Sequence, residues 1–400
     1  MVFKGVIFIF YNDYAGFIMG RVVAALDKSC TYSGIPTDCE HPAFDGLEAE
    51  EIKVLFDPLS TATTKNLGAI VQVNLKCKEK ESVISATRKL KKNPCIIAAE
   101  PDRRMNPHVV PNDPYFRYLW GLRNTMAPMA WNHSTGNRKV VVGVVDSGVD
   151  FMHPDLNNNM WSNSPNDGLY GWNFYNDSRN PMDETGHGTH VAGTIGAIGN
   201  NHIGVTGVCW NVSMAALKIG NNFFSVSAAI RAINYANKYK IPILNNSWGG
   251  VYCPILRIAI ENYNGLFVAS AGNAASNNDI SPVFPASFGL RNIISVASTA
   301  ENNSLSSFSN YGEISVDIAA PGSDILSTHL LSRYSYLSGT SMAAPHVSGA
   351  AALLKAYRPD LTVNDIKSII MSSASILPQL QGKVLTGGLL NINRMLEMAA

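Results

Sequence analysis

Two kinds of hydrophobic pattern divide the chain into a smaller and a larger part. In the smaller part, short apolar runs bounded by polar residues predict strands at residues 21–26, 70–75 and 96–99. Val83, Ala86 and Leu90 share one face at helical spacing, which predicts a helix over residues 81–92. Together these elements predict a small α+β unit.

The larger part alternates apolar runs with helical patterns. The runs occupy residues 140–145, 214–219, 243–247, 266–270 and 293–297. Because their apolar residues are consecutive rather than alternating, we expect strands buried on both faces of a mostly parallel sheet, with helices covering it. The predicted fold is a doubly wound α/β domain, in which functional residues follow the carboxyl ends of the strands.

A polar, proline-punctuated stretch at residues 100–114 separates the two parts and is typical of a linker. The predicted organisation is an uncertain segment, a small domain and a large domain, at residues 1–19, 20–106 and 107–400. Lys4 and the apolar residues 5–10 resemble a stunted signal peptide, but no small-residue cleavage site follows. A buried strand or a mis-assigned start is the alternative.

Composition narrows the classes of function. Only 15% of the 400 residues are charged and the formal net charge is +1, so we expect no nucleic-acid partner. No apolar run reaches the roughly 18 residues that span a bilayer, so we expect no stable membrane insertion. The six cysteines form no regular framework, which leaves disulfides and the compartment open. Cys209 and Cys253 are expected to be small buried hydrophobic residues.

Two polar residues follow predicted strands or begin a predicted helix in positions suited to catalysis. Asp146 comes directly after residues 140–145, and His187 lies in the glycine-flanked motif GHGTHVAG. A histidine general base needs one ring nitrogen free and the other held by a carboxylate, which Asp146 can supply. Alone, Asp146 could be a turn residue, and no GxGxxG follows to favour dinucleotide binding. His190 is expected to be structural, because a metal site would lack a third ligand.

A serine and an asparagine complete the candidate chemistry. Ser341 stands in SGTSMAAPHVSG at the start of an apolar helix, where backbone N–H groups and the positive end of the helix dipole favour an anion. Asn273 follows residues 266–270 and offers a side-chain N–H donor to a developing oxyanion. The ordinary alternatives are a helix N-cap serine and a turn asparagine.

Together these motifs resemble those of the subtilisin family, in which Asp, His and Ser follow one another in this order. The resemblance covers about residues 113–400. The segments PNDPYF at 111–116, FSNYG at 308–312 and AAPG at 319–322 are similar to those of thermitase-like enzymes in particular. It implies a subtilisin-like fold and a serine endopeptidase that works through an acyl-enzyme, without a catalytic metal or organic cofactor.

The resemblance also assigns roles at the site. Ser341 would attack the scissile carbonyl, His187 would move the proton, Asp146 would orient the imidazole, and Asn273 would stabilise the oxyanion together with the Ser341 backbone N–H. Peptide substrates would pair with a strand and fill an apolar pocket formed by Ser247, Trp248, Gly249, Ala271, Gly272 and Val283. We expect apolar or aromatic residues before the scissile bond. Residues 220–224 depart from the family pattern, so preferences further from the cut stay open.

Relatives hold a structural calcium ion with hard oxygen ligands. The matching positions are the side chains of Asp113, Asp155 and Asn201 and the carbonyls near Ile198, Ile203 and Val205. The alternative is that these residues only form turns. The loop at residues 173–182 matches a second calcium loop less well, because amides and Ser178 replace several acidic positions, and no second ion is assigned to it.

The smaller part resembles a ferredoxin-like propeptide of this family, which assists folding and inhibits the enzyme until it is removed. Cleavage is then expected between Glu100 and Asn112. A secreted or cell-surface, monomeric endopeptidase acting on proteins is the favoured hypothesis. The alternative is a protease-like module that binds peptides without cutting them, although no member of the triad and no oxyanion donor is missing.

Overall fold

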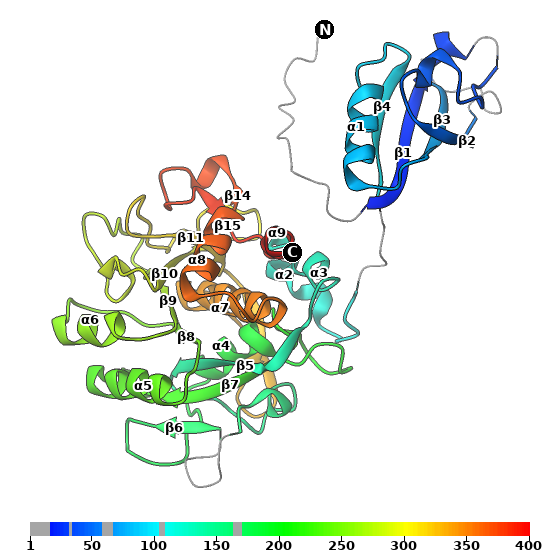
Figure 1. Cartoon of the computed structure of the whole chain (residues 1–400). Helices are drawn as coiled ribbons and strands as arrows, with labels where there is room; N and C mark the ends of the chain where they lie inside the picture. The colour runs from blue at the N-terminus through cyan, green and yellow to red at the C-terminus, as the bar shows by residue number, and fades with distance from the viewer. Residues whose placement is uncertain (1–16, 32–33, 58–66, 104–108, 163–169) are drawn as a thin grey trace. The chain divides into compact units, whose positions relative to one another are not determined.

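The chain folds into two compact units, residues Met1–Pro107 and His108–Ala400. The computed structural model describes residues 17–31, 34–57, 67–103, 109–162 and 170–400, and Figure 1 traces the elements of each unit. Residues 1–16, where a signal peptide was considered, and part of the expected cleavage region lie outside these ranges. No helix in the described ranges is long and apolar enough to cross a bilayer.

The described residues of the N-terminal unit form a four-stranded antiparallel sheet and one α-helix. Its elements are β1 (Phe17–Asp27), β2 (Ala49–Phe56), β3 (Leu67–Leu75), α1 (Lys80–Leu90) and β4 (Ile96–Arg103). The sheet order is β2-β3-β1-β4, with β1 between β3 and β4. The predicted strands and helix are present. Short 3-10 turns at Lys28–Cys30 and Pro42–Phe44 occupy the β1–β2 connection, where a ferredoxin-like fold has a helix.

A disulfide closes the N-terminal unit. Cys30, just after β1, is bonded to Cys95, just before β4, across a sequence separation of 65 residues. The unit has its own apolar core between α1 and one face of the sheet, which includes Val22, Val71 and Leu90. In a unit this small, a covalent closure of a long loop is a sizeable addition to a limited core.

The second unit is built on a nine-stranded sheet. Its strands are β5 (Gly136–Asp146), β6 (Gly171–Asn173), β7 (Asn211–Lys218), β8 (Ile243–Asn246), β9 (Leu266–Ser270), β10 (Ile293–Thr299), β11 (Ile318–Pro321), β14 (Ser375–Ile376) and β15 (Gly388–Leu389). The order is β14-β15-β11-β10-β9-β8-β5-β7-β6. All neighbours are parallel except β14 and β15. The mostly parallel α/β fold is therefore confirmed.

Helices cover both faces of this sheet (Figure 1). The face toward α4 (His187–Gly196) and α7 (Thr340–Tyr357) shares a core with α2 (Trp120–Asn124), α3 (Ala127–Ala130), α8 (Val363–Ser372) and α9 (Ile392–Ala399). The other face packs against α5 (Val226–Lys238) and α6 (Pro254–Glu261). Val144 enters the first core and its neighbour Val145 the second, and both are fully buried. Burial on both faces explains why the strands are continuously apolar.

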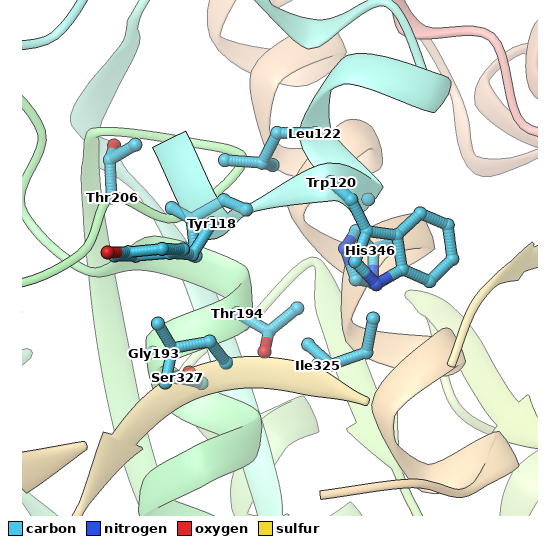
Figure 2. A pocket seen from close by; sticks show the side chains of 12 residues that line it. Tyr118, Trp120, Leu122, Gly193, Thr194, Thr206, Ile325, Ser327 and His346 are labelled. Atoms are coloured by element: carbon cyan, nitrogen blue, oxygen red, sulfur yellow. The ribbon is translucent and has the colours of Figure 1, made fainter. Parts of the chain in front are cut away.

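A hairpin stands outside the main sheet and helps to enclose a small cavity. It consists of β12 (Ile325–His329) and β13 (Arg333–Leu337). Figure 2 shows the cavity, where Trp120 and Leu122 from α2, Thr194 from α4 and Ser327 from β12 approach His346 of α7. Its volume of about 20 Å³ suits a single water molecule. This cavity is too small for a peptide side chain.

Candidate active site

The candidate catalytic residues gather at the carboxyl edge of the sheet. Asp146 is the last residue of β5, Asn273 lies three residues after β9, His187 begins α4, and Ser341 is the second residue of α7. In a parallel sheet all these strand ends open on the same edge, so residues far apart in the sequence meet there.

Asp146 and His187 form a short hydrogen bond. The His187 Nδ1 lies 2.6 Å from Asp146 Oδ1, which also accepts from the backbone N–H of Ser147 at 2.8 Å. Asp146 is fully buried, while the His187 side chain is 32% exposed and accessible to a substrate. Burial by itself lowers the pKa of His187, but the charge and hydrogen bond of Asp146 outweigh it, and the pKa lies above its ordinary value.

Glycines make this contact possible. A Cβ at Gly188 would lie 2.1 Å from the carbonyl oxygen of Gly148 and 3.2 Å from Asp146 Oδ1. The first turn of α4 therefore packs directly on the end of β5 and the turn after it, which any larger residue would prevent. The GHG motif positions the imidazole and does not merely leave it accessible.

Ser341 is held at the start of α7. Its hydroxyl donates to the carbonyl of Ser247 at 3.1 Å, and the Ser247 hydroxyl donates to the carbonyl of Ser341 at 2.8 Å. Within the described ranges no hydrogen bond joins the Ser341 hydroxyl to His187. A rotation about the Cα–Cβ bond of Ser341 would redirect the hydroxyl, and catalytic hydrogen bonds commonly tighten only when substrate is bound.

Asn273 is oriented so that its amide N–H₂ stays available. Its Oδ1 accepts from the Thr340 backbone N–H at 2.8 Å and from the Thr340 hydroxyl at 2.9 Å. A Cβ at Gly339 would lie 3.4 Å from Asn273 Nδ2 and 3.6 Å from the Ser341 backbone nitrogen. The two donors therefore border the same space, which is the arrangement that an oxyanion requires.

A groove of about 670 Å³ runs beside Ser341 and contains most of the predicted pocket. Trp248, Gly249, Gly272 and Val283 line it, and no charged side chain of the described residues does so. A Cβ at Gly249 would lie 2.9 Å from Val283 Cγ1, and one at Gly272 would lie 3.6 Å from Val283 Cγ2. The methyl groups of Val283 thus lie close to both Gly249 and Gly272.

Two predicted pocket residues have other surroundings. Ala271 is fully buried and packs in a core cluster with Ala297 and Val316, because alternate residues after β9 point to opposite sides. Ser247 is 3% exposed, and its hydroxyl bonds to Ser341 rather than lining the groove. Their side chains do not face this groove.

His190 has a structural environment. Its Nε2 donates to the carbonyls of Ile325 at 2.8 Å and Ser335 at 3.0 Å, which ties α4 to the β12–β13 hairpin. Burial lowers the pKa of His190 to about 3 despite these bonds, so the ring is neutral near pH 7.

The predicted calcium ligands come together around two buried carboxylates. Asp155 Oδ1 accepts from the Asn201 amide at 2.8 Å, and Oδ2 accepts from the Val205 N–H and the Tyr334 hydroxyl, each at 2.9 Å. Asp113 Oδ2 accepts from the Asn200 N–H at 2.7 Å, whereas its buried Oδ1 has no hydrogen-bond partner among the described residues. Ile198 and Ile203 lie in the same loop, where the Ile198 N–H donates to the Asp155 carbonyl.

The charges at this cluster are poorly balanced by protein groups. Burial raises the pKa of both Asp113 and Asp155, and the charge of Asp155 raises that of Asp113 further. The described residues contain no group of three or more His, Cys, Asp or Glu side chains suited to a metal. Two carboxylates with an amide and carbonyl oxygens nevertheless form a donor set that fits calcium.

Sequence reasoning assigned no role to three residues that order the site. Thr340 holds Asn273, and Ser147 donates to Asp183 while accepting from the Gly188 N–H. Asn310 accepts from the backbone N–H groups of Ala274 and Ser276 and so fixes the turn after Asn273. Thr340 and Ser147 adjoin catalytic residues and could have been suspected. Asn310 lies in the FSNYG segment at 308–312, but its contacts with the turn after Asn273 join segments far apart in the sequence.

Comparison with known proteins identifies the family. The subtilase family model matches residues 137–391, which include Asp146, His187, Asn273 and Ser341. The chain belongs to the subtilase family. This subtilase shares 43% identity over 231 residues with subtilisin-like protease 2 of Plasmodium falciparum, which is 55% of the chain but 17% of that protein.

Two further similar proteins match a larger share of this chain. Thermitase of Thermoactinomyces vulgaris is 39% identical over 251 residues, which is 61% of this subtilase and 85% of thermitase. A protease structure from Pseudoalteromonas arctica superimposes with a TM-score of 0.64 and 29% identity, over 73% of this chain and 100% of that one. The resemblance to thermitase-like enzymes and the subtilisin fold are therefore confirmed.

The oxyanion arrangement yields a first prediction. Replacing Asn273 by Ala should lower kcat by a factor on the order of 10²–10³, the size that loss of one oxyanion donor has in subtilisin, with little change in KM. Steady-state cleavage of a chromogenic peptide measures both constants, and the melting temperature checks that the variant is folded. Equal kcat values for the folded variant and wild type would rule out this role.

Proposed function

We propose that this subtilase is a serine endopeptidase made as a self-processing precursor. The main support is geometric. Asn273 Nδ2 and the Ser341 backbone nitrogen border one space at Gly339, and Asp146 holds His187 at the same edge of the sheet. If Ser341 were only a helix N-cap and Asn273 only a turn residue, nothing would require their donor groups to lie together.

The groups act in the order that their chemistry dictates. His187 takes the Ser341 proton as the hydroxyl oxygen attacks the scissile carbonyl, and the imidazolium that forms is stabilised by Asp146. The oxyanion accepts hydrogen bonds from Asn273 and the Ser341 N–H. His187 then protonates the leaving amine, and water hydrolyses the acyl-enzyme by the same route.

Mass spectrometry of the full chain tests this proposal. Wild type should lose its N-terminal unit by a cut between Glu100 and Asn112, while Ser341→Ala should stay full length. Wild type, but not the variant, should also cleave casein. If both proteins stay intact in calcium-containing buffer and neither cleaves casein, the peptide-binding module becomes the better account.

The pocket supports a preference for apolar residues before the scissile bond. Its lining residues are uncharged, and the methyl groups of Val283 lie between Gly249 and Gly272. Small or medium aliphatic side chains would fit above Val283 more readily than large aromatic rings, although both classes are apolar.

Replacing Val283 by a smaller residue tests this proposed substrate preference. In Val283→Gly the ratio of kcat/KM for a Phe substrate to that for an Ala substrate should rise by about tenfold or more, because space between the walls is opened. Val251→Gly, which changes an 89% exposed residue at the rim, is the control. An unchanged ratio would mean that Val283 does not set the pocket depth.

The N-terminal unit is proposed to be the propeptide, an intramolecular folding aid and inhibitor. It is a separate compact unit with its own core and precedes the peptidase unit in the chain. Its disulfide also supports a secreted or cell-surface location, since such bonds form and persist in oxidising compartments.

We also propose a structural calcium ion at Asp113, Asp155 and Asn201. A bound cation would supply positive charge to two buried carboxylates and would bind the orphan Asp113 Oδ1. Asn201 Oδ1 accepts from the Ile203 N–H, and Asp155 Oδ2 accepts from the Val205 N–H, so both side chains hold this loop. The ion would stabilise the fold without entering the reaction.

Removing the ion should lower the melting temperature. Calcium at about 100 times its Kd stabilises a fold by about 2.7 kcal/mol, which corresponds to roughly 5 °C in a unit of this size. Calorimetry of Ser341→Ala with calcium or with chelator should give this difference. Adding Asp113→Asn should abolish it, and adding the exposed Asp360→Asn should not. A calcium-independent melting temperature in the parent protein would contradict the site.

A further inference from the structure

A second buried carboxylate, Asp183, lies beside the Asp146–His187 pair. It belongs to the loop between β6 and α4 and is 4% exposed. It accepts hydrogen bonds from the backbone N–H and hydroxyl of Thr185 at 2.9 and 3.1 Å, and from those of Thr189 at 3.0 and 2.7 Å. The Ser147 hydroxyl is a fifth donor at 2.9 Å. All five donors are neutral groups.

These bonds enclose the catalytic pair. Thr185 and Thr189 lie on either side of His187 in the chain, and Ser147 directly follows Asp146. The Ser147 hydroxyl also accepts from the Gly188 backbone N–H at 2.9 Å. Asp183 thus connects the segment that carries His187 to Ser147, the residue next to Asp146. These bonds hold His187 and Asp146 at a fixed separation.

The Asp183 loop is itself held in place. Lys218 is 1% exposed, and its ammonium donates to the Met182 carbonyl at 2.8 Å and lies 3.5 Å from Glu184 Oε1. Lys218 is the register partner of Asp146 between β7 and β5. A Cβ at Gly148 would lie 2.9 Å from the Asp183 backbone nitrogen, so the loop packs closely on the turn after β5.

We propose that Asp183 is a positioning residue that fixes His187 against Asp146 and adds a second negative charge to stabilise the imidazolium formed during catalysis. This inference rests on the proposed peptidase function. It goes beyond the triad, because Asp183 acts through Ser147, Thr189 and its charge and does not touch the reacting atoms.

The electrostatics agree with this geometry. Burial alone raises the pKa of Asp183, but the hydrogen bonds from Thr185, Thr189 and Ser147 outweigh burial, and the net pKa is lowered. The carboxylate is therefore charged near neutral pH. Its charge adds to that of Asp146 in raising the pKa of His187 against the effect of burial.

Other titratable groups surround the imidazole. His190 on α4 is neutral near pH 7, and His329 on β12 packs its ring against Gly186, where a Cβ would lie 2.3 Å from His329 Nε2. Lys218 and Glu184 lie at the loop and partly cancel one another. Asp146 and Asp183 are therefore the charges that favour the imidazolium.

A purely structural role for Asp183, as a capping group for α4, is the competing explanation. It predicts lower stability without a change in the titration of His187. The matched control is Asp317, another carboxylate largely shielded from solvent, with a side chain that is 14% exposed. It accepts from the Ser295 N–H and pairs with Lys367 just before β11, away from the carboxyl edge.

The test combines a titration with kinetics on the full chain. In the Ser341→Ala background, which cannot turn over substrate, NMR of ¹⁵N-histidine follows His187. Adding Asp183→Asn should move its midpoint to lower pH, because loss of the negative charge destabilises the imidazolium. Adding Asp317→Asn should leave the midpoint unchanged. This readout stands even if wild type proves inactive, so the two proposals can fail separately.

Kinetics test the positioning role. Asp183→Asn and Ser147→Ala should each lower kcat, by up to about 10²-fold for a misplaced base, with KM little changed. Asp317→Asn should keep the wild-type kcat. If folded Asp183→Asn retains both the His187 midpoint and kcat, the proposal is wrong. If that variant does not fold, Ser147→Ala decides, and an unchanged kcat there overturns the positioning role.

Discussion

The packing of α4 on the end of β5 is the contact on which the site depends. Without a side chain at Gly188, the helix approaches the strand closely enough for His187 to reach Asp146 at 2.6 Å. α7 meets the same sheet edge, and Thr340 couples its first turn to Asn273. The catalytic groups are thus fixed by backbone packing of rigid elements and not by flexible loops, which favours a preorganised site.

The pKa of a buried carboxylate in this protein depends on how far its hydrogen bonds offset the effect of burial. Asp183 receives five hydrogen bonds and its pKa is lowered, whereas Asp113 and Asp155 have fewer donors for their burial and their pKa values are raised. The first arrangement supports a charge near the base without any metal. The second leaves a need for positive charge that the surrounding residues do not meet, and this difference separates the proposed positioning group from the proposed cation site.

Much of the fold could be predicted because buried parallel strands are continuously apolar, as in β5, β7 and β9. β2 was missed because Glu50, Glu51 and Lys53 interrupt its apolar pattern and only Ala49 and Ile52 are buried. The candidate triad and Asn273 were predicted from long motifs, and the structure brings Asp146 and His187 together. The contacts of Asn310 and the surroundings of Ala271 were not predicted, since each depends on contacts between distant segments.

The Cys30–Cys95 bond has a consequence for how the N-terminal unit is dismantled. A single nick anywhere between these residues leaves two fragments covalently joined, one carrying β1, a central strand of the sheet, and the other carrying β4, an edge strand. Such fragments would migrate as one species until a reductant is added. The unit therefore separates into pieces only when the disulfide is reduced or when further peptide bonds are broken.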